Sequence, residues 1–257
     1  MHRLVALLVV MWLASSPAAL AAPAEKFAAA NQAFSDGEFQ SAYNSYQALL
    51  DDGHLNADLL YNLGNASYRL ERPGEAVLWY ERTLTLDPTH KEAKQNLRFL
   101  KRTSGILQFE PVAYEPLINW IRRDDLLRIA SVAGWLAVLG IAAALTLRLR
   151  RGLNTTLWLC SPLFATVALA AGIGIFLKHK RQSNLDTRAI VVAADVKALT
   201  APARSAASVI ELPPGSQISI VSNRDDWDYI DVPGELRAWV PADSLKPLWP
   251  YESSLAD

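Results

Sequence analysis

Two long stretches without a charged side chain set the strongest limit on how this chain can fold. Residues 129–147 and 156–177 are 19 and 22 residues long and almost wholly apolar. A helix needs about 20 apolar residues to cross the hydrocarbon core of a bilayer. Only residues 148–155 separate the two stretches. We therefore expect a helical hairpin: transmembrane helix 129–147, a cytoplasmic turn over 148–155 and transmembrane helix 156–177.

The composition excludes several classes of functional site. Among 257 residues there is one cysteine, and 25 basic residues nearly balance 26 acidic ones. These counts exclude a disulfide framework and a thiolate metal site, and they give no sign of nucleic-acid binding. The four histidines lie far apart and none has metal-ligand spacing from another. We expect no metal, no cofactor, no catalytic residue and no enzyme activity.

The N-terminus predicts an exported chain. Arg3 precedes an apolar run over 4–14, and Ala19-Leu20-Ala21 has the small-x-small pattern of a cleavage site. This predicts a signal peptide over 1–21; the alternative is an uncleaved signal anchor. Because a hairpin returns the chain to the side on which it started, the parts before and after it share one compartment. Arg148, Arg150 and Arg151 in the short turn favour a cytoplasmic position for that turn.

Residues 24–102 contain an internal repeat. A shift of 34 places Phe34 on Tyr68, Ala42 on Ala76 and Tyr46 on Tyr80, and the second copy also has Leu60-x-x-Leu63-Gly64 and Pro88. This pattern resembles the tetratricopeptide repeat, in which small residues allow two antiparallel helices to approach closely. We expect Tyr68 and Tyr80 to fill the space beside Gly64 and Ala76. The copies depart from the family pattern at Ser67 and Thr83, and the first copy is looser.

The first helices of such repeats line a concave surface, which suggests a protein-binding groove. Asparagine amides can pair with the backbone of an extended segment. The alternative is that these are ordinary solvated helix positions. Since about three repeats are usually needed for a stable stack, two repeats and one further helix should be capped by that helix, or completed by a partner or a second copy of the chain. The candidate groove residues are Asn31, Asn62, Asn65, Arg69 and Asn96.

A linker and juxtamembrane segment is expected over 103–128, and short alternating runs separated by turn residues follow the hairpin over 187–249. They resemble the bacterial SH3-like (SH3b) domain through 196–199, 226–229 and 238–241, which implies a small all-β barrel. Trp227, Tyr229 and Trp239 are its candidate peptide-binding residues; the alternative is that they form the barrel's own core. The expected strands are 189–192, 209–212, 216–221, 227–232 and 237–240.

The order of these segments resembles the BatE-type proteins of the bacterial aerotolerance operon. The resemblance implies a multidomain inner-membrane protein with tetratricopeptide-repeat hairpins, a two-helix transmembrane hairpin and an SH3-like barrel. The exported N-terminus and the hairpin together predict that both flanking domains lie in the periplasm. The expected role is a non-enzymatic scaffold or assembly subunit, with von Willebrand A-domain membrane proteins as partners in a MoxR-linked stress system. The alternative is a cell-wall sensor or tether whose barrel binds peptidoglycan peptides.

Overall fold

The structure is a computed structural model that describes residues 18–110, 121–146 and 151–249. Contacts divide the chain into two compact units. The first joins Met1–Phe109 to Asp186–Asp257, and the second is Glu110–Leu185. Most of the predicted signal peptide lies outside the described residues. The predicted cleavage point after Ala21 falls in the first turn of the first described helix.

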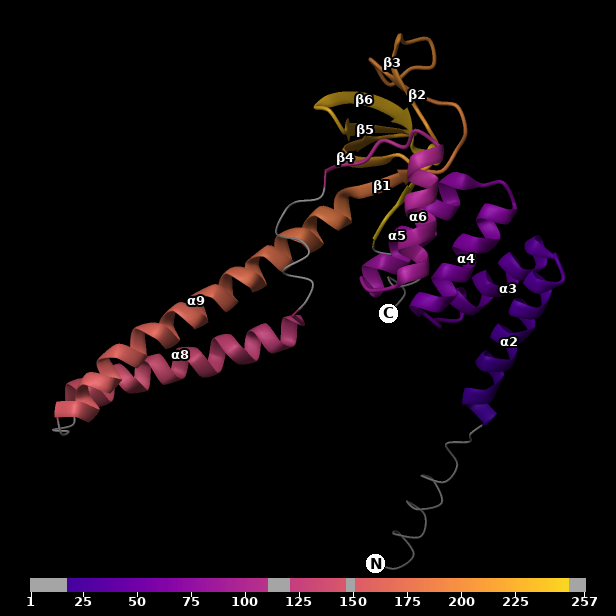
Figure 1. The fold of residues 1–257 in the computed structure, drawn as a ribbon. Helices are drawn as coiled ribbons and strands as arrows, with labels where there is room; N and C mark the ends of the chain where they lie inside the picture. Colours follow the sequence, from indigo (N-terminus) through magenta and orange to yellow (C-terminus); the bar gives the residue numbers. More distant parts are fainter. Residues whose placement is uncertain (1–17, 111–120, 147–150, 250–257) are drawn as a thin grey trace, which may run out of the picture. The chain divides into compact units, whose positions relative to one another are not determined.

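Five helices form the N-terminal part of the first unit (Figure 1). They pack as two consecutive hairpins, α2 with α3 and α4 with α5, and α6 follows. Leucines at 49, 50, 59, 60 and 63 fill the space between the first hairpin and α4. The prediction of tetratricopeptide-like hairpins is therefore confirmed. The bounds are α2 (Ala18–Ser35), α3 (Phe39–Asp51), α4 (Ala57–Arg69), α5 (Pro73–Leu86) and α6 (Lys91–Thr103).

The close approach of α4 and α5 depends on Gly64. A Cβ atom added there would lie 2.6 Å from Cε1 of Tyr80, whose ring is fully buried. Tyr80 thus fills the space beside Gly64, as the repeat pattern predicts. Tyr68 behaves differently from the expectation, because 43% of it is exposed. It lies one turn beyond Gly64 on α4, where its ring faces away from the helix pair and into a surface pocket.

The C-terminal part of the first unit is one antiparallel sheet with strand order β3-β2-β6-β5-β4-β1-β7. The sheet is open, since no pairing joins the edge strands β3 and β7 among the described residues. The prediction of a closed barrel is therefore wrong. Strands β2 and β7 were absent from the expected set. The bounds are β1 (Arg188–Val191), β2 (Val196–Leu199), β3 (Ser208–Leu212), β4 (Gln217–Arg224), β5 (Trp227–Val232), β6 (Leu236–Pro241) and β7 (Leu245–Pro247).

Alternation along the strands gives the sheet one buried face. In β5, Asp228, Ile230 and Val232 are buried while the residues between them are partly exposed. Ile230 and Val232 join Ala189, Ile218 and others in a single apolar cluster. This period of two is what a half-buried strand requires.

The sheet packs directly on α5. A Cβ atom at Gly74 would lie 2.7 Å from the carbonyl oxygen of Val191 in β1, so only glycine permits this approach. Gly215, with φ +91°, sits against the side chains of Val77 and Ile106. Ile106 belongs to the segment expected to be a linker. That segment instead contacts the sheet, and the amide of Gln217 donates to the carbonyl oxygen of Leu107 at 2.9 Å.

Polar contacts fix the same interface. The buried Arg82 guanidinium donates to the carbonyl oxygens of Pro247 at 2.8 Å and Leu248 at 3.2 Å. Glu81 Oε1 accepts from Gln217 Nε2 at 2.7 Å and pairs with Lys101 Nζ at 2.9 Å. The sheet therefore covers the outer side of α5, and the repeats and the sheet form one compact unit. The short repeat array is completed by a part of the same chain.

The second unit contains α8 (Arg123–Thr146) and most of α9 (Arg151–Thr187). Both helices are long and apolar enough to cross a membrane. They pack through small residues: Gly140 of α8 faces Ser161 of α9, and Gly174 of α9 faces Leu126 of α8. Large apolar side chains point outward, Leu159 being 72% exposed. Such surfaces are stable in lipid rather than in water, which favours the predicted hairpin.

Candidate protein-binding groove

The predicted groove asparagines form a hydrogen-bond ladder between helices. Asn31 Oδ1 in α2 accepts from the Tyr46 hydroxyl at 2.7 Å and from Asn62 Nδ2 at 3.1 Å. In the next repeat, Asn65 Oδ1 accepts from the Tyr80 hydroxyl at 2.7 Å and from Asn96 Nδ2 at 3.1 Å. The two sets are related by the 34-residue shift. Each joins one repeat to the first helix of the next.

This ladder changes what the asparagines can offer to a ligand. The acceptor oxygens of Asn31 and Asn65 each already have two donors, so little acceptor capacity remains for a partner's backbone. Asn96 Nδ2 is similarly engaged, because it also approaches the Tyr80 hydroxyl at 3.2 Å. Their main structural effect is to fix the spacing of α2, α4 and α6.

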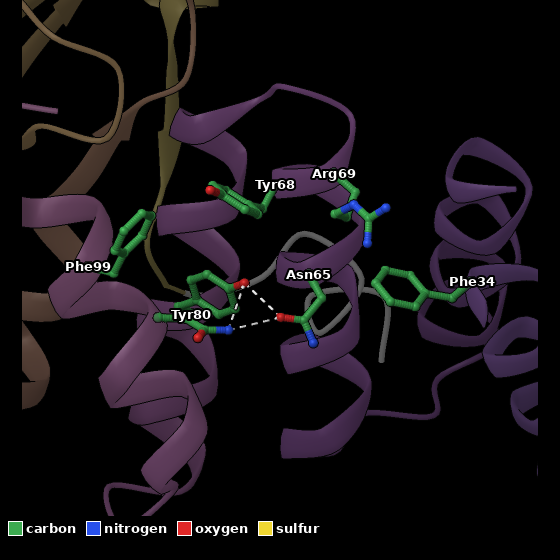
Figure 2. Close-up of a pocket in the computed structure, with 7 residues that line it drawn as sticks. Phe34, Asn65, Tyr68, Arg69, Tyr80 and Phe99 are labelled. Carbon is green, nitrogen blue, oxygen red and sulfur yellow. Dashed lines mark hydrogen bonds between the residues drawn. The ribbon is translucent and has the colours of Figure 1, made fainter. Parts of the chain in front are cut away.

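A surface pocket of about 200 Å³ lies beside the second rung of the ladder. Figure 2 shows Phe34 of α2 on one side, Asn65, Tyr68 and Arg69 of α4, and Phe99 on the other side. Tyr68 and Phe99 meet edge to face, with ring centroids 6.3 Å apart, and 52% of Phe99 is exposed. Apolar rings therefore dominate the groove. Its lining residues are Phe34, Asn65, Tyr68, Arg69, Tyr80, Asn96 and Phe99.

The structure thus gathers Asn65, Arg69 and Asn96 in the pocket and leaves Asn31 and Asn62 outside its lining. The sequence analysis did not predict the three rings Phe34, Tyr68 and Phe99 as groove residues, although a signal for this exists. Each stands three residues after an asparagine, at 34, 68 and 99. Residues three apart share one face of a helix, so a ring at each of these positions lies on the same side as the ladder.

The aromatic candidates of the sheet lie on the face away from its core. Tyr229 pairs with Trp239 across β5 and β6, and their ring centroids are 4.9 Å apart. Trp227 is opposite Pro241 on the same face. All three rings are partly exposed. The alternative that they form the domain's core does not match this arrangement, since the buried cluster is made of other residues.

Burial of Tyr46 and Tyr80, the two tyrosines of the hydrogen-bond ladder, should make the stability of the protein depend on pH. Burial raises the pKa of Tyr46 to about 12 and raises the pKa of Tyr80 as well. An unfolded tyrosine has a pKa of about 10, so each contributes stability that is present below pH 10 and lost as the pH rises through its folded pKa. We expect the full-length protein to lose stability above pH 10.

The matching variant is Tyr46→Phe/Tyr80→Phe. At pH 8 it should be less stable by about 1–2 kcal/mol, because each lost hydroxyl leaves an asparagine oxygen with one donor fewer. Between pH 10 and 12 it should lose less stability than the wild type, since these groups can no longer ionise. Thermal unfolding in detergent, followed by circular dichroism, measures both. Equal alkaline losses in the two proteins would contradict the assignment.

Among the described residues, no group of three or more histidine, cysteine, aspartate or glutamate side chains is placed to hold a metal ion. The groove itself contains no nucleophile with an adjacent base. What it offers is an apolar pocket with one cation at its rim. Its geometry suits the binding of a protein segment.

Comparison with known proteins finds similarity in the helical part. The family described as tetratricopeptide repeat matches residues 27–91. Protein O-mannosyl-transferase TMTC3 from Homo sapiens is 34% identical over 86 residues, which are 33% of this chain and 9% of that protein. The chain therefore spans less than a tenth of the length of this relative. Tetratricopeptide repeats are protein-interaction modules, so the repeats favour a scaffold role.

Proposed function

We propose that this protein is a membrane-anchored scaffold that holds a partner protein in the groove formed by α2, α4 and α6. The observation that supports it best is the pair of exposed rings, Tyr68 and Phe99, around an open pocket in the repeat array. Clustered exposed aromatic side chains are typical of surfaces that bind proteins. The hairpin of α8 and α9 would confine the complex to a membrane and raise the effective concentration of the bound partners.

A more specific proposal about location and partners rests on the order of segments in the chain. That order is similar to BatE-type proteins, so we propose a bacterial inner-membrane location with the repeats and the sheet in the periplasm. The partner class proposed on the same ground is von Willebrand A-domain membrane proteins of a MoxR-linked aerotolerance or envelope-stress system. The proposed role is assembly and carries no catalytic step. The sheet would belong to an SH3-like domain.

A second candidate function is a cell-wall sensor or tether. It is favoured by the outward aromatic face of the sheet, where Trp227, Tyr229 and Trp239 are partly exposed and away from the core. Such a face could contact peptidoglycan stem peptides. The repeats would then recruit envelope enzymes.

Crosslinking pull-down of the full-length protein from native membranes separates the two. The wild type is compared with Tyr68→Ala/Phe99→Ala in the groove and with Trp227→Ala/Trp239→Ala in the sheet. The scaffold predicts membrane-protein partners whose recovery falls at least about tenfold in the groove variant, since central aromatic anchors commonly contribute 2 kcal/mol or more to binding. Recovery in the sheet variant should stay within about twofold of the wild type.

Binding to purified sacculi, measured in parallel, tests the tether. Sacculus binding that is lost in the sheet variant, with no membrane-protein partner recovered, would replace the scaffold by the tether. Recovery of partners that neither variant reduces would move the contact away from both surfaces and contradict the groove assignment. Circular dichroism of each variant shows whether its helices remain folded.

A further inference from the structure

Arg69 is a cation held at the rim of the groove, and it has no acidic partner in the part of the chain that the structure describes. Its guanidinium stacks over the ring of Phe39, with its central carbon 3.9 Å from the ring centroid. None of the ion pairs among the described residues includes Arg69. Stacking limits the motion of the side chain and leaves its planar edge available. A guanidinium held in this way can bind a carboxylate without a large entropic cost.

A second arginine that forms no ion pair with any described residue follows on α6. Arg102 stands three residues after Phe99, on the same side of the helix, and it is exposed. It takes part in no ion pair among the described residues. Helix α6 as a whole has five basic residues and one acidic residue over Lys91–Thr103. Arg69 and Arg102 thus place two positive charges on the α4 and α6 side of the groove.

The pocket itself contains no carboxylate. Its seven lining residues are three rings, a buried tyrosine, two asparagines and Arg69. Asn65 Oδ1 is occupied by Tyr80 and Asn96, whereas Asn65 Nδ2 donates to no group among the described residues. Asn65 Nδ2 and the Arg69 guanidinium are therefore donors available to a ligand, and the only charged group among the described lining residues is the positive Arg69. A ligand that matches it supplies acceptors and negative charge next to an apolar group.

We infer that the segment bound in this groove carries an apolar anchor flanked by acidic side chains. The anchor would enter the pocket between Tyr68 and Phe99, and the carboxylates would pair with Arg69 and Arg102. This inference rests on the proposed protein-binding function of the groove. It adds the chemical class of the partner. Complementary charges at the rim of an interface set orientation and discriminate between partners, while buried apolar anchors supply most of the affinity.

Three synthetic peptides labelled with fluorescein test the inference on the full-length protein in neutral detergent. They share leucine and phenylalanine anchors and differ only in the intervening residues, which are Asp and Glu, Asn and Gln, or Lys. Fluorescence anisotropy gives the Kd of each at low and high salt. We expect the acidic peptide to bind about tenfold more tightly than its amide counterpart, and this advantage to shrink at high salt.

The variants assign the effect to the two arginines. Arg69→Gln/Arg102→Gln should remove the advantage of the acidic peptide, so that the acidic and amide peptides bind with equal Kd. Arg98→Gln is the matched control, because it changes one exposed charge of α6 on another side of the helix. Acidic and amide peptides that bind equally, yet lose binding in Tyr68→Ala/Phe99→Ala, would overturn the acidic class and keep the groove.

Two further outcomes are decisive. Tighter binding of the lysine peptide would overturn the inference, because the groove would then present net negative potential. Absence of binding by all three peptides would overturn it too. The proposed scaffold would still be tested separately by the pull-down with the groove variant, so the failure of one is distinguishable from the failure of the other.

Discussion

Replacing Gly74 by alanine is expected to separate the sheet from the repeats. In the first turn of an exposed helix, glycine to alanine usually stabilises by up to about 1 kcal/mol. Here the added Cβ would meet the carbonyl oxygen of Val191 at 2.7 Å and Cα of Val192 at 2.8 Å. Both are backbone atoms that no rotamer can move. We therefore expect a net loss of about 2–4 kcal/mol in the free energy of unfolding, as for other overpacked interfaces.

Hydrogen exchange of the full-length protein locates this effect. Amides of β1 and β7 should lose protection in Gly74→Ala, because β1 lies against α5 and β7 pairs with β1. Gly172→Ala in α9 is the control, since a Cβ there meets nothing within 4 Å. Unchanged protection of β1 in Gly74→Ala would mean that the sheet does not depend on this contact.

The helical part of the fold is readable from the sequence because its determinants are local. Gly64, Ala76 and Tyr80 recur at fixed spacing, and each lies within one helical hairpin. The two apolar stretches are readable for the same reason, as length and composition alone specify them. Residues that determine packing within one hairpin recur at regular intervals in the sequence, so their pattern can be recognised there.

The contact between the sheet and α5 has no periodic pattern in the sequence. Arg82 reaches the carbonyl oxygen of Pro247 across 165 positions in the sequence, and Gly74 meets Val191 across more than 100. A glycine near a helix start looks like an ordinary turn residue until its neighbour is known. Sheet closure is equally non-local. The run over 209–212 predicts the strand β3, but only its lack of pairing with β7 makes the sheet open.

Only part of the groove could be predicted from the sequence. The asparagines were predicted to bind a partner because they are polar residues on the concave side. In the structure the side-chain oxygens of Asn31 and Asn65 instead accept hydrogen bonds from tyrosines of the array. The rings three residues later define the pocket. We expected Tyr68 to pack beside Gly64 and assigned no role to Phe99, because a single sequence gives the face of a helix and not whether a neighbour covers it. Exposure of Tyr68 and Phe99 is a tertiary property.

Replacing Gly64 by alanine is expected to destabilise the repeat array itself. The new Cβ would lie 2.6 Å from Cε1 and 2.7 Å from Cδ1 of Tyr80. The ring cannot withdraw, since it is fully buried and its hydroxyl is bound to Asn65. We expect a loss of about 2–4 kcal/mol, against a gain of about 1 kcal/mol from helix propensity. The groove should open as the ladder between α4 and α6 breaks, so that peptide binding falls with stability.

A double-mutant cycle isolates the steric cause. Tyr80→Val removes the ring atoms that Gly64→Ala would meet, at the cost of a cavity. In that background Gly64→Ala should change sign and stabilise the array by up to about 1 kcal/mol, because only the helix-propensity effect of alanine remains. Thermal unfolding of the four full-length proteins measures the coupling between the two positions. Additive effects would show that glycine is required at position 64 for a reason other than its contact with the Tyr80 ring, since a purely local backbone effect would persist when the ring is removed.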